Sequence, residues 1–455
     1  MSSTPSAPPP ATGEDEPQDA PGRQPRRKGG GDVAATAQQE VQFGDLVLRF
    51  TSSFDFRYND RDSGANLDGG FWHPIPTTGF HALGSIGMPN YNDPNGKVAA
   101  LCVKASQPLI PGLLKPALKP PTDYEFIWND KGSGARHDGS CWRPLAPEGY
   151  VALGDVFAKG YNKPALNDVM CVARELTFNG VVGGLIWDDR GSGANRDFSS
   201  YQIDPSRAYR ESSEGLFAVN SFAGVGSYTK PLTSPVANTL RLPVPVVESG
   251  EAPLPQLTSK TQPPAHTVPV VDRIVTVPFT AVIDADKTID WILQNSPFYT
   301  VQRSVYYDLL IYNNNGTATP QKNSRSIQTG VTKTQTETFS INVGITVSYE
   351  SGVNAGVGSS KTSVQLSLQL GYQTSTAIAV MQSETQTAEL TTLPQTAAAL
   401  WLASNELQVF RADKTPVAPA LGFNEGNTAY ISQQYPPPAE GELGATYTRT
   451  RITNR

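Results

Sequence analysis

Three stretches of the chain each place two aspartates eight residues apart, with an aromatic residue four positions after the second. The sets are Asp60, Asp68 and Trp72, then Asp130, Asp138 and Trp142, then Asp189, Asp197 and Tyr201. Carboxylates beside an exposed ring can hold a sugar, because the acids accept hydroxyl hydrogen bonds and the ring stacks on the sugar face. Carboxylate oxygens are also ligands for Ca²⁺. The spacing therefore marks candidate receptor or glycan contacts.

The same stretches also allow a purely structural interpretation. Each first aspartate opens an Asp-x-x-Ser-Gly-Ala sequence, in which the acid can cap a turn and the glycine can take a positive φ. The aromatic residues are equally suited to filling a core. Calcium loops need oxygen ligands at alternate positions, and only the first copy has the further acid Asp62, where the others have Gly132 and Gly191. The structural role is favoured over sugar contact, and no metal site is predicted.

A second pattern concerns membrane insertion. Apolar and polar side chains alternate in two arms between residues 339 and 372. A strand points successive side chains to opposite faces, so each arm has one apolar and one polar face. The apolar positions are Phe339, Ile341, Val343, Ile345, Val347 and Tyr349 in the first arm, and Val364, Leu366, Leu368, Leu370 and Tyr372 in the second. The residues expected to face a pore lumen are Ser348, Glu350, Lys361, Ser363, Gln365, Ser367 and Gln369.

The two arms suit a β-barrel that spans a membrane. The first arm has 11 residues, and a tilted strand needs about 9–11 residues to cross a bilayer. A hairpin with one apolar and one polar face can line a water-filled barrel in lipid. The alternative is two strands of an ordinary antiparallel sheet that packs on a core by one face. The length of the arms, and the Ser/Thr-rich flanks at 329–338 and 374–392, favour the barrel.

The aspartate stretches belong to a threefold internal repeat between about residues 43 and 240. The first aspartates are 70 and 59 residues apart, and Tyr91, Tyr161 and Tyr228 close the three units. Each unit alternates short apolar runs with Gly, Pro, Asn and Asp turns, which predicts a small sheet of about four strands. Such a unit cannot bury one face alone, so we expect the three to close around a pseudo-threefold axis. A β-prism-like domain is favoured, with a β-trefoil-like barrel as the alternative.

The rest of the chain divides by composition. Residues 1–42 are polar and Pro-rich, which predicts a disordered tail. The Pro-rich residues 241–265 predict a semi-rigid linker. An elongated β-domain at 266–435 contains the two arms, and 436–455 form a C-terminal tail. The expected fold class is therefore all-β.

The composition excludes several functional classes. The net charge is −6 and the pI is about 5.4, whereas nucleic-acid binding usually needs a basic patch. The sequence has neither the long apolar run of a transmembrane helix nor the apolar core of a signal peptide, so we expect a soluble protein released by another route. Cys102, Cys141 and Cys171 predict buried thiols rather than a disulfide framework. Because no nucleophile–base set or cofactor loop stands out, neither an enzyme nor a cofactor is expected.

The repeats resemble a known domain family. Copies one and two share Trp-x-Pro, from Trp72 and Trp142, and then Gly-Phe/Tyr-x-Ala-Leu-Gly in the same register. This pattern is similar to the family named after vacuolar protein sorting protein 62, over about residues 43–240. Copy three departs from it, with Tyr201 in place of the tryptophan and Val219-Asn220 in place of Leu-Gly. The resemblance implies no mechanism.

The second domain has Ser/Thr-rich strands that bracket the two arms, and a strand that Pro394 opens. In these features residues 266–435 resemble the aerolysin-type β-pore-forming family, including the insecticidal toxins related to epsilon toxin. The resemblance implies that soluble protomers bind a surface receptor (glycan, lipid or protein), form a homo-oligomeric ring and insert a barrel into the target-cell membrane. The insertion hairpin would then cover about residues 349–370. The alternative function is a lectin-like module that multimerises through its C-terminal domain without lysis.

Overall fold

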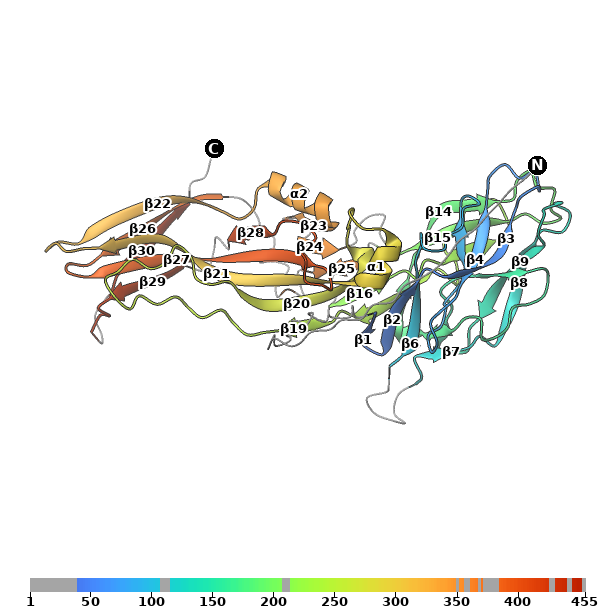
Figure 1. The fold of residues 1–455 in the computed structure, drawn as a ribbon, viewed down its shortest axis with the longest axis horizontal. Helices are drawn as coiled ribbons and strands as arrows, with labels where there is room; N and C mark the ends of the chain where they lie inside the picture. Colours follow the sequence, from blue (N-terminus) through green and yellow to red (C-terminus); the bar gives the residue numbers. More distant parts are fainter. Residues whose placement is uncertain are drawn as a thin grey trace, which may run out of the picture. The chain divides into compact units, whose positions relative to one another are not determined.

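The computed structural model describes residues 39–106, 115–206, 213–348, 352–355, 361–366, 370, 384–424, 430–439 and 444–451. These residues form antiparallel sheets, two single 3₁₀ turns and two short α-helices, α1 (Ile289–Asn295) and α2 (Lys333–Val343) (Figure 1). The all-β prediction is therefore confirmed. Residues 37–455 form one compact unit, and the expected tail lies outside the described residues up to position 38. No helix in the described part of the chain is long and apolar enough to cross a membrane.

One three-stranded sheet from each repeat packs on a core that all three repeats share. These sheets are β3 (Phe54–Asn59), β4 (Gly70–Pro74) and β5 (Ile86–Met88); β8 (Asp123–Asn129), β9 (Gly139–Leu145) and β11 (Val156–Lys159); and β14 (Val181–Asp188), β15 (Ser199–Asp204) and β17 (Phe222–Val225). Each first strand has a bulge just before Tyr58, Trp128 or Trp187. These three aromatic residues all belong to the shared core, so the repeats are structurally equivalent.

Each repeat also contributes a second three-stranded set. The strands are β1 (Glu40–Phe43), β2 (Leu46–Thr51) and β6 (Ala100–Ala105); β7 (Leu118–Lys119), β12 (Cys171–Ala173) and β10 (Tyr150–Val151); and β13 (Thr177–Asn179), β18 (Asn238–Pro243) and β16 (Glu214–Phe217). The prediction that each repeat forms a single sheet of about four strands is therefore wrong. A repeat builds two sheets because its apolar runs are short and are separated by turns that reverse the chain.

The aspartate loops interlock the three repeats in a cycle. Each loop donates one backbone hydrogen bond to the loop of another repeat, and the three bonds are equivalent. They run from Asn66 N to Arg190 O at 2.7 Å, from Arg136 N to Arg61 O at 2.8 Å, and from Asn195 N to Lys131 O at 2.8 Å. This is the closed, pseudo-threefold arrangement that the repeat spacing predicts.

The three cysteines are buried free thiols, as the sequence predicts. Burial raises the pKa of Cys102 and Cys171 to about 12. A thiol is reactive only as a thiolate, so these cysteines act as small apolar core residues.

The C-terminal part is built from much longer strands. One sheet runs in the order β19 (Val246–Glu248), β20 (Val270–Pro278), β21 (Phe298–Asn314), β27 (Ala397–Phe410) and β28 (Leu421–Asn424), and β29 (Tyr430–Tyr435) also pairs with β27. A second sheet holds β22 (Gln321–Thr329), β26 (Glu384–Thr392) and β30 (Thr446–Arg451). The strands β21 and β27 have 17 and 14 residues and pair along most of their length (Figure 1). The segment expected to be a linker thus contains β19, and the segment expected to be a tail contains β30.

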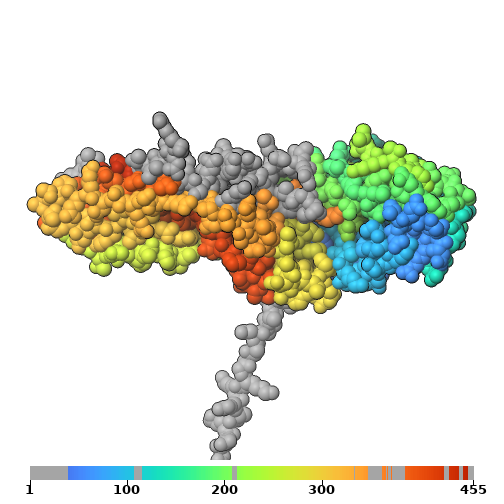
Figure 2. All heavy atoms as spheres, turned by 90° about the horizontal axis from the view of Figure 1, so that it is seen from above, coloured from blue at the N-terminus to red at the C-terminus, as the bar shows by residue number. Residues whose placement is uncertain are grey.

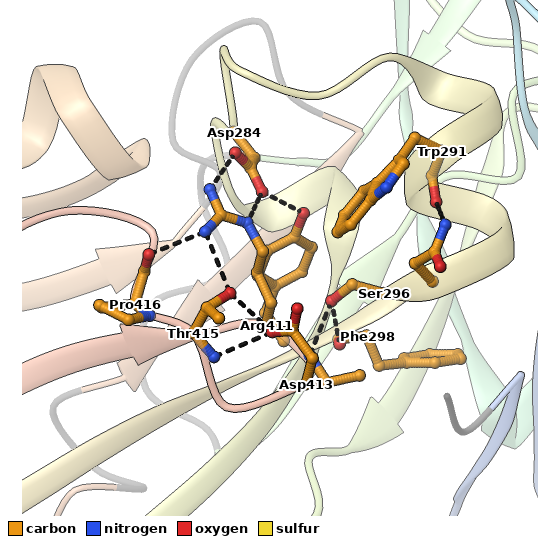
Figure 3. Close-up of polar contacts among 11 residues, drawn as sticks. Asp284, Trp291, Ser296, Phe298, Arg411, Asp413, Thr415 and Pro416 are labelled. Carbon is orange, nitrogen blue, oxygen red and sulfur yellow. Dashed lines mark hydrogen bonds and ion pairs between the residues drawn. The ribbon is translucent and has the colours of Figure 1, made fainter. Parts of the chain in front are cut away.

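A buried ion pair fastens the loop before α1 to the end of β27 (Figure 3). Arg411 donates from Nε and Nη2 to the two carboxylate oxygens of Asp284, each at 2.7 Å, and Tyr299 donates to the same carboxylate at 2.9 Å. The other terminal nitrogen of Arg411 donates to Thr415 and to the carbonyl of Pro416. Because the guanidinium and the carboxylate are both well supplied with partners, the pair is stable despite its burial.

Candidate functional site

The first aspartate of each repeat is buried and holds its own loop together. Asp60, Asp130 and Asp189 are 2–3% exposed. Each accepts a hydrogen bond from the backbone N–H nine residues further on, at 2.8–3.0 Å. The position two residues after each aspartate has a positive φ, which Asp62 adopts in the first repeat and Gly132 and Gly191 adopt in the others. The turn therefore accounts for the motif without a ligand.

The second oxygen of two of these aspartates, Asp60 and Asp189, accepts a hydrogen bond from another repeat. Trp187 Nε1 donates to Asp60 at 3.1 Å, and Trp128 Nε1 donates to Asp189 at 2.9 Å. Tyr58 is the equivalent residue of the first repeat, but its buried hydroxyl has no hydrogen-bond partner among the described residues. Burial raises the pKa of all three carboxyl groups above the ordinary value for aspartate, and their hydrogen bonds partly oppose this shift. Asp60 and Asp189 are therefore structural links between repeats, and Asp130 holds its own loop.

The second aspartates, Asp68, Asp138 and Asp197, are exposed, and each faces the tyrosine that closes its repeat. Tyr161, for example, donates to Asp138 at 2.9 Å. A basic side chain of the loop also forms a cation–π contact with the ring of each tyrosine, 4.6–4.7 Å from the ring centre. The pairs are Arg61 with Tyr91, Lys131 with Tyr161, and Arg190 with Tyr228. Within the described residues no group of three or more His, Cys, Asp or Glu could hold a metal ion.

The predicted stacking residues are buried. Trp72, Trp142 and Tyr201 are 4%, 9% and 4% exposed. Trp72 packs edge-on against Phe56, and Trp142 packs in the same way against Phe126. A ring without an exposed face cannot stack on a sugar, so their description as exposed platforms is wrong. They fill the core because each strand turns alternate side chains inward.

The two amphipathic arms are not a continuous hairpin in this structure. Phe339, Ile341 and Val343 lie in α2, whereas the arm becomes extended only in β23 (Ile345–Ser348). The second arm begins in β25 (Thr362–Gln365), and β24 (Gly352–Ala355) lies between the two. The backbone of Val347, Ser348 and Gln365 is described but their side chains are not. The predicted residues that lie outside the described part are Tyr349, Glu350, Ser367, Leu368, Gln369 and Tyr372.

Local helix signals explain why the strand expected over 339–343 is wrong. Thr332 and Gln335 form a capping box, in which each side chain bonds the other residue's backbone N–H. Gly344 ends the helix with a left-handed conformation, at φ 73°. A cap at each end outweighs the alternation of the residues between them. The signal was present in the sequence at Thr332, Gln335 and Gly344.

Most of the described apolar residues of the arms are buried, and one is conspicuously exposed. Phe339, Val343 and Ile345 from the first arm and Val364, Leu366 and Leu370 from the second belong to the main core cluster. Ile341 is 73% exposed on the outer side of α2, and the orange region that contains α2 lies at the surface in Figure 2. Six of the seven apolar arm residues whose side chains are described are therefore buried.

The described start of the second arm pairs with the sheet of the third repeat. The edge strand β16 pairs with β25, so one sheet runs β13-β18-β16-β25-β24-β23. Ala218 N donates to Lys361 O at 2.8 Å, and Lys361 Nζ lies 3.2 Å from the Asp204 carboxylate. The hydroxyls of Thr280 and Thr362 are also hydrogen-bonded. Lys361, which is expected in a pore lumen, forms an ion pair with Asp204 in this structure, and Ser363 pairs opposite Leu216. No sequence signal marks β16 as this partner, because it lies far away along the chain.

The N-terminal part of the chain matches a family model. Residues 20–235 match vacuolar protein sorting-associated protein 62, which is less than half of the 455 residues. This finding supports the resemblance expected for the repeats. No curated protein sequence matches the chain. The resemblance of residues 266–435 to the aerolysin type stays a prediction.

Two solved structures are similar to the chain at a low level. GNIP1Aa from Chromobacterium piscinae is 30% identical over 43% of this chain and 37% of its own, with a TM-score of 0.35. The match thus spans little more than a third of the GNIP1Aa chain. Cry35Ab1 is 11% identical over 87% of this chain and 91% of its own, also with a TM-score of 0.35. At these TM-scores neither structure carries an argument about function.

Proposed function

We propose that this protein is a β-pore former that stores its membrane-inserting arms on the third repeat. The observation that carries the proposal is a conflict between pattern and conformation. Residues 339–349 alternate as a strand with one apolar face, yet Lys333–Val343 are held in a helix that leaves Ile341 in water. An exposed isoleucine contributes nothing to this fold, whereas it completes the lipid-facing row of an extended arm.

The insertion step requires assembly of several protomers. An isolated hairpin would carry unpaired backbone groups into lipid, which costs several kcal/mol per group in order of magnitude. A ring of protomers pairs every arm with its neighbours and removes this cost. Burial in lipid of an apolar side chain that leaves water, such as that of Ile341, is then favourable by about 1.5–3 kcal/mol, whereas side chains that are already buried in the core gain little. Homo-oligomerisation on a target-cell membrane, reached through the repeat domain, is therefore part of the proposal.

Two matched substitutions on α2 test the proposal. Ile341 and Asn342 are neighbours, and both are exposed in the helix. In an extended arm they point to opposite faces, one to lipid and one to the lumen. We expect Ile341→Lys to reduce dye release strongly from liposomes made of target-membrane lipids, because a lysine on the lipid face costs up to about 2–4 kcal/mol in each protomer, less near an interface, and the cost recurs in every protomer of the ring. Asn342→Lys should retain release, since its lysine faces water.

Both variants should unfold in urea like the parent, within about 0.5 kcal/mol, because the two positions are exposed. Equal loss of dye release in the two variants would contradict an alternating barrel strand. A parent protein that neither forms large oligomers on liposomes nor releases dye would reject pore formation altogether. In that case the non-lytic, lectin-like function would remain.

A further inference from the structure

An arginine of the first repeat stands where the other repeats have an isoleucine. The first strand of each repeat bulges at one residue, which is Arg57, Ile127 or Ile186. Both isoleucines pack in or against the shared aromatic core, whereas Arg57 lines an open groove of about 370 Å³. A bulge re-aims side chains in this way. The fold therefore does not require a cation at this position.

The hydrogen-bond donors of Arg57 are poorly used. Its side chain is only 19% exposed, and its Nε atom is buried without a hydrogen-bond partner in the described part of the chain. This atom lies 3.4 Å from the carboxylate of Asp55, which already accepts a hydrogen bond from Lys159 at 2.8 Å. A charged donor that is buried without an acceptor destabilises the fold, and an oxygen atom supplied by a ligand removes this penalty.

The second repeat completes the groove with two polar residues, Asn167 and Asp168. The backbone carbonyl of Asp168 accepts a hydrogen bond from His73, but its carboxylate has no hydrogen-bond or ion-pair partner among the residues that the structure describes. Ile75 is 51% exposed and, together with Pro76, gives the groove an apolar side. The groove thus combines a free donor, a free acceptor and an apolar surface.

The charges around the groove balance. The carboxylates of Asp55 and Asp168 are opposed by Arg57 and by Lys159. An anionic ligand would meet the carboxylate of Asp168 and a cationic ligand would meet Arg57, so an uncharged ligand that both donates and accepts hydrogen bonds fits best. Sugar hydroxyls do both, and the C–H face of a sugar ring packs on apolar side chains. We propose that this groove binds one uncharged sugar unit of a glycan, to which Arg57 donates and from which Asp168 accepts.

The other repeats do not offer this combination. In the second repeat, the groove at the same place contains Arg143, whose guanidinium already donates two hydrogen bonds to Asp155. Pro235 and Val236 line that groove from the neighbouring repeat, and neither has a polar side chain. The third repeat has Ile186 in place of the arginine. We therefore expect one sugar site in each protein chain.

A sugar site would give the repeat domain its means of attachment to a target cell, so the biological role of the inference rests on the proposed function. Its test does not, because sugar binding is measured in solution without a membrane. Sugar binding without dye release from liposomes would support the inference and reject pore formation. Dye release without sugar binding would support pore formation and overturn the inference.

The test titrates the full chain with glucose, galactose, mannose, N-acetylglucosamine and N-acetylgalactosamine. Saturation-transfer NMR measures binding, and hydrogen exchange read by mass spectrometry locates it. We expect saturable binding of at least one of these sugars, with slower amide exchange in the peptides that contain residues 75–82 and 167–168. Arg57→Ile and Asp168→Ala should each weaken binding by about tenfold or more, because each removes a hydrogen bond to a charged group. The same substitution at an exposed arginine, Arg136→Ile, should leave binding unchanged.

Arg57→Ile should keep the thermal midpoint of the parent, because isoleucine occupies the same place in the other repeats. A much lower midpoint would assign the guanidinium to the fold and overturn the inference. The inference also fails if none of the five sugars binds, if Arg57→Ile binds like the parent, or if protection appears at residues 143–152 instead. Binding of N-acetylneuraminic acid alone, which carries a carboxylate, would identify an anionic ligand and reject an uncharged sugar.

Discussion

Buried polar residues in the repeat domain act as links between repeats rather than as binding groups. Asp60 and Asp189 each bond their own loop and a tryptophan of another repeat. A buried carboxylate without such donors would destabilise the fold by several kcal/mol in order of magnitude. The aspartate and the tryptophan that donates to it therefore depend on each other. Tyr58 is the exception, because its hydroxyl has no described partner. In the first repeat the tyrosine therefore buries a hydroxyl that forms no hydrogen bond with the described residues.

His73 makes the stability of the repeat domain depend on pH. The ring is 5% exposed, and its nitrogens lie 3.0 Å from the Ser85 hydroxyl and 3.0 Å from the Asp168 carbonyl. The Ser85 oxygen already accepts from Phe157 N, so its proton goes to Nδ1 of His73, and Nε2 donates to the carbonyl. Burial, aided by the positive charge of Arg57, lowers the pKa of His73 to about 4.

The folded pKa of His73 lies below the value of an unfolded histidine. The neutral ring therefore contributes stability that is fully present above pH 6.5 and is lost as the pH falls towards 4. The loss amounts to about 3 kcal/mol. We expect urea unfolding to show a shallower pH dependence in this window for His73→Gln than for the parent. The exposed His137 provides the control, and a His73→Gln profile parallel to that of His137→Gln would contradict the assignment.

At the scale of elements, the described part of the two arms combines the helix α2 with the short strands β23 and β25. The helix α2 depends on its two caps, and β25 pairs with β16 over only three residues, Thr362–Val364. An ion pair and a hydroxyl contact reinforce the end of this pairing. The proposed insertion needs a segment that opens at low free-energy cost, and short pairing favours this.

Reversing the charge of Asp204 should loosen the stored arm. The side chains of Lys361 and Asp204 are 23% and 35% exposed, so the pair contributes at most about 1 kcal/mol. We expect Asp204→Lys to speed amide exchange in residues 361–366 by about fivefold, because two positive charges then face each other. Adding Lys361→Asp should restore the slow exchange. Reversal of the exposed pair Arg136 and Asp62 serves as the control. Unchanged exchange in Asp204→Lys would show that the ion pair does not hold the arm.

At the scale of the whole molecule, the repeats and the long-stranded part share one core. The ring of Phe43 lies 5.4 Å from that of Phe217 and 6.1 Å from that of Phe298, and Phe50 lies 4.7 Å from Phe279. The apolar residues of the stored arms belong to the same cluster. Apolar burial across such a boundary couples the stability of both parts.

The shared core predicts that residues 37–455 unfold cooperatively. We expect one calorimetric transition for the parent, and Phe298→Ala should lower the free energy of unfolding by about 3–5 kcal/mol through the cavity that it leaves. The transition should stay single in this variant. Leu232→Ala should change little, because Leu232 is 98% exposed. Two separate transitions, of which Phe298→Ala shifts only one, would show that the parts unfold independently.

The sequence by itself determined the features that depend on local periodicity. Alternating apolar runs between turns predicted an all-β chain, the three aligned aspartate loops predicted a closed repeat domain, and three unpaired cysteines predicted buried thiols. The family resemblance of the repeats also followed from residues such as Trp72 and Trp142. These predictions succeed because the spacing of apolar residues along the backbone decides which face of an element is apolar. This holds whichever residues from elsewhere in the chain pack against that face.

Only the tertiary structure decided what the described residues of the arms pair with and pack against. Alternation in 339–349 shows that two faces differ, but it does not choose between a capped helix and a strand, nor does it name β16 as the partner of β25. The contact of Lys361 with Asp204 followed from the meeting of residues far apart in the chain. The physical reason is that hydrogen-bond pairing and burial are set by which surfaces meet in space, and one sequence window carries no information about the surface that it will meet.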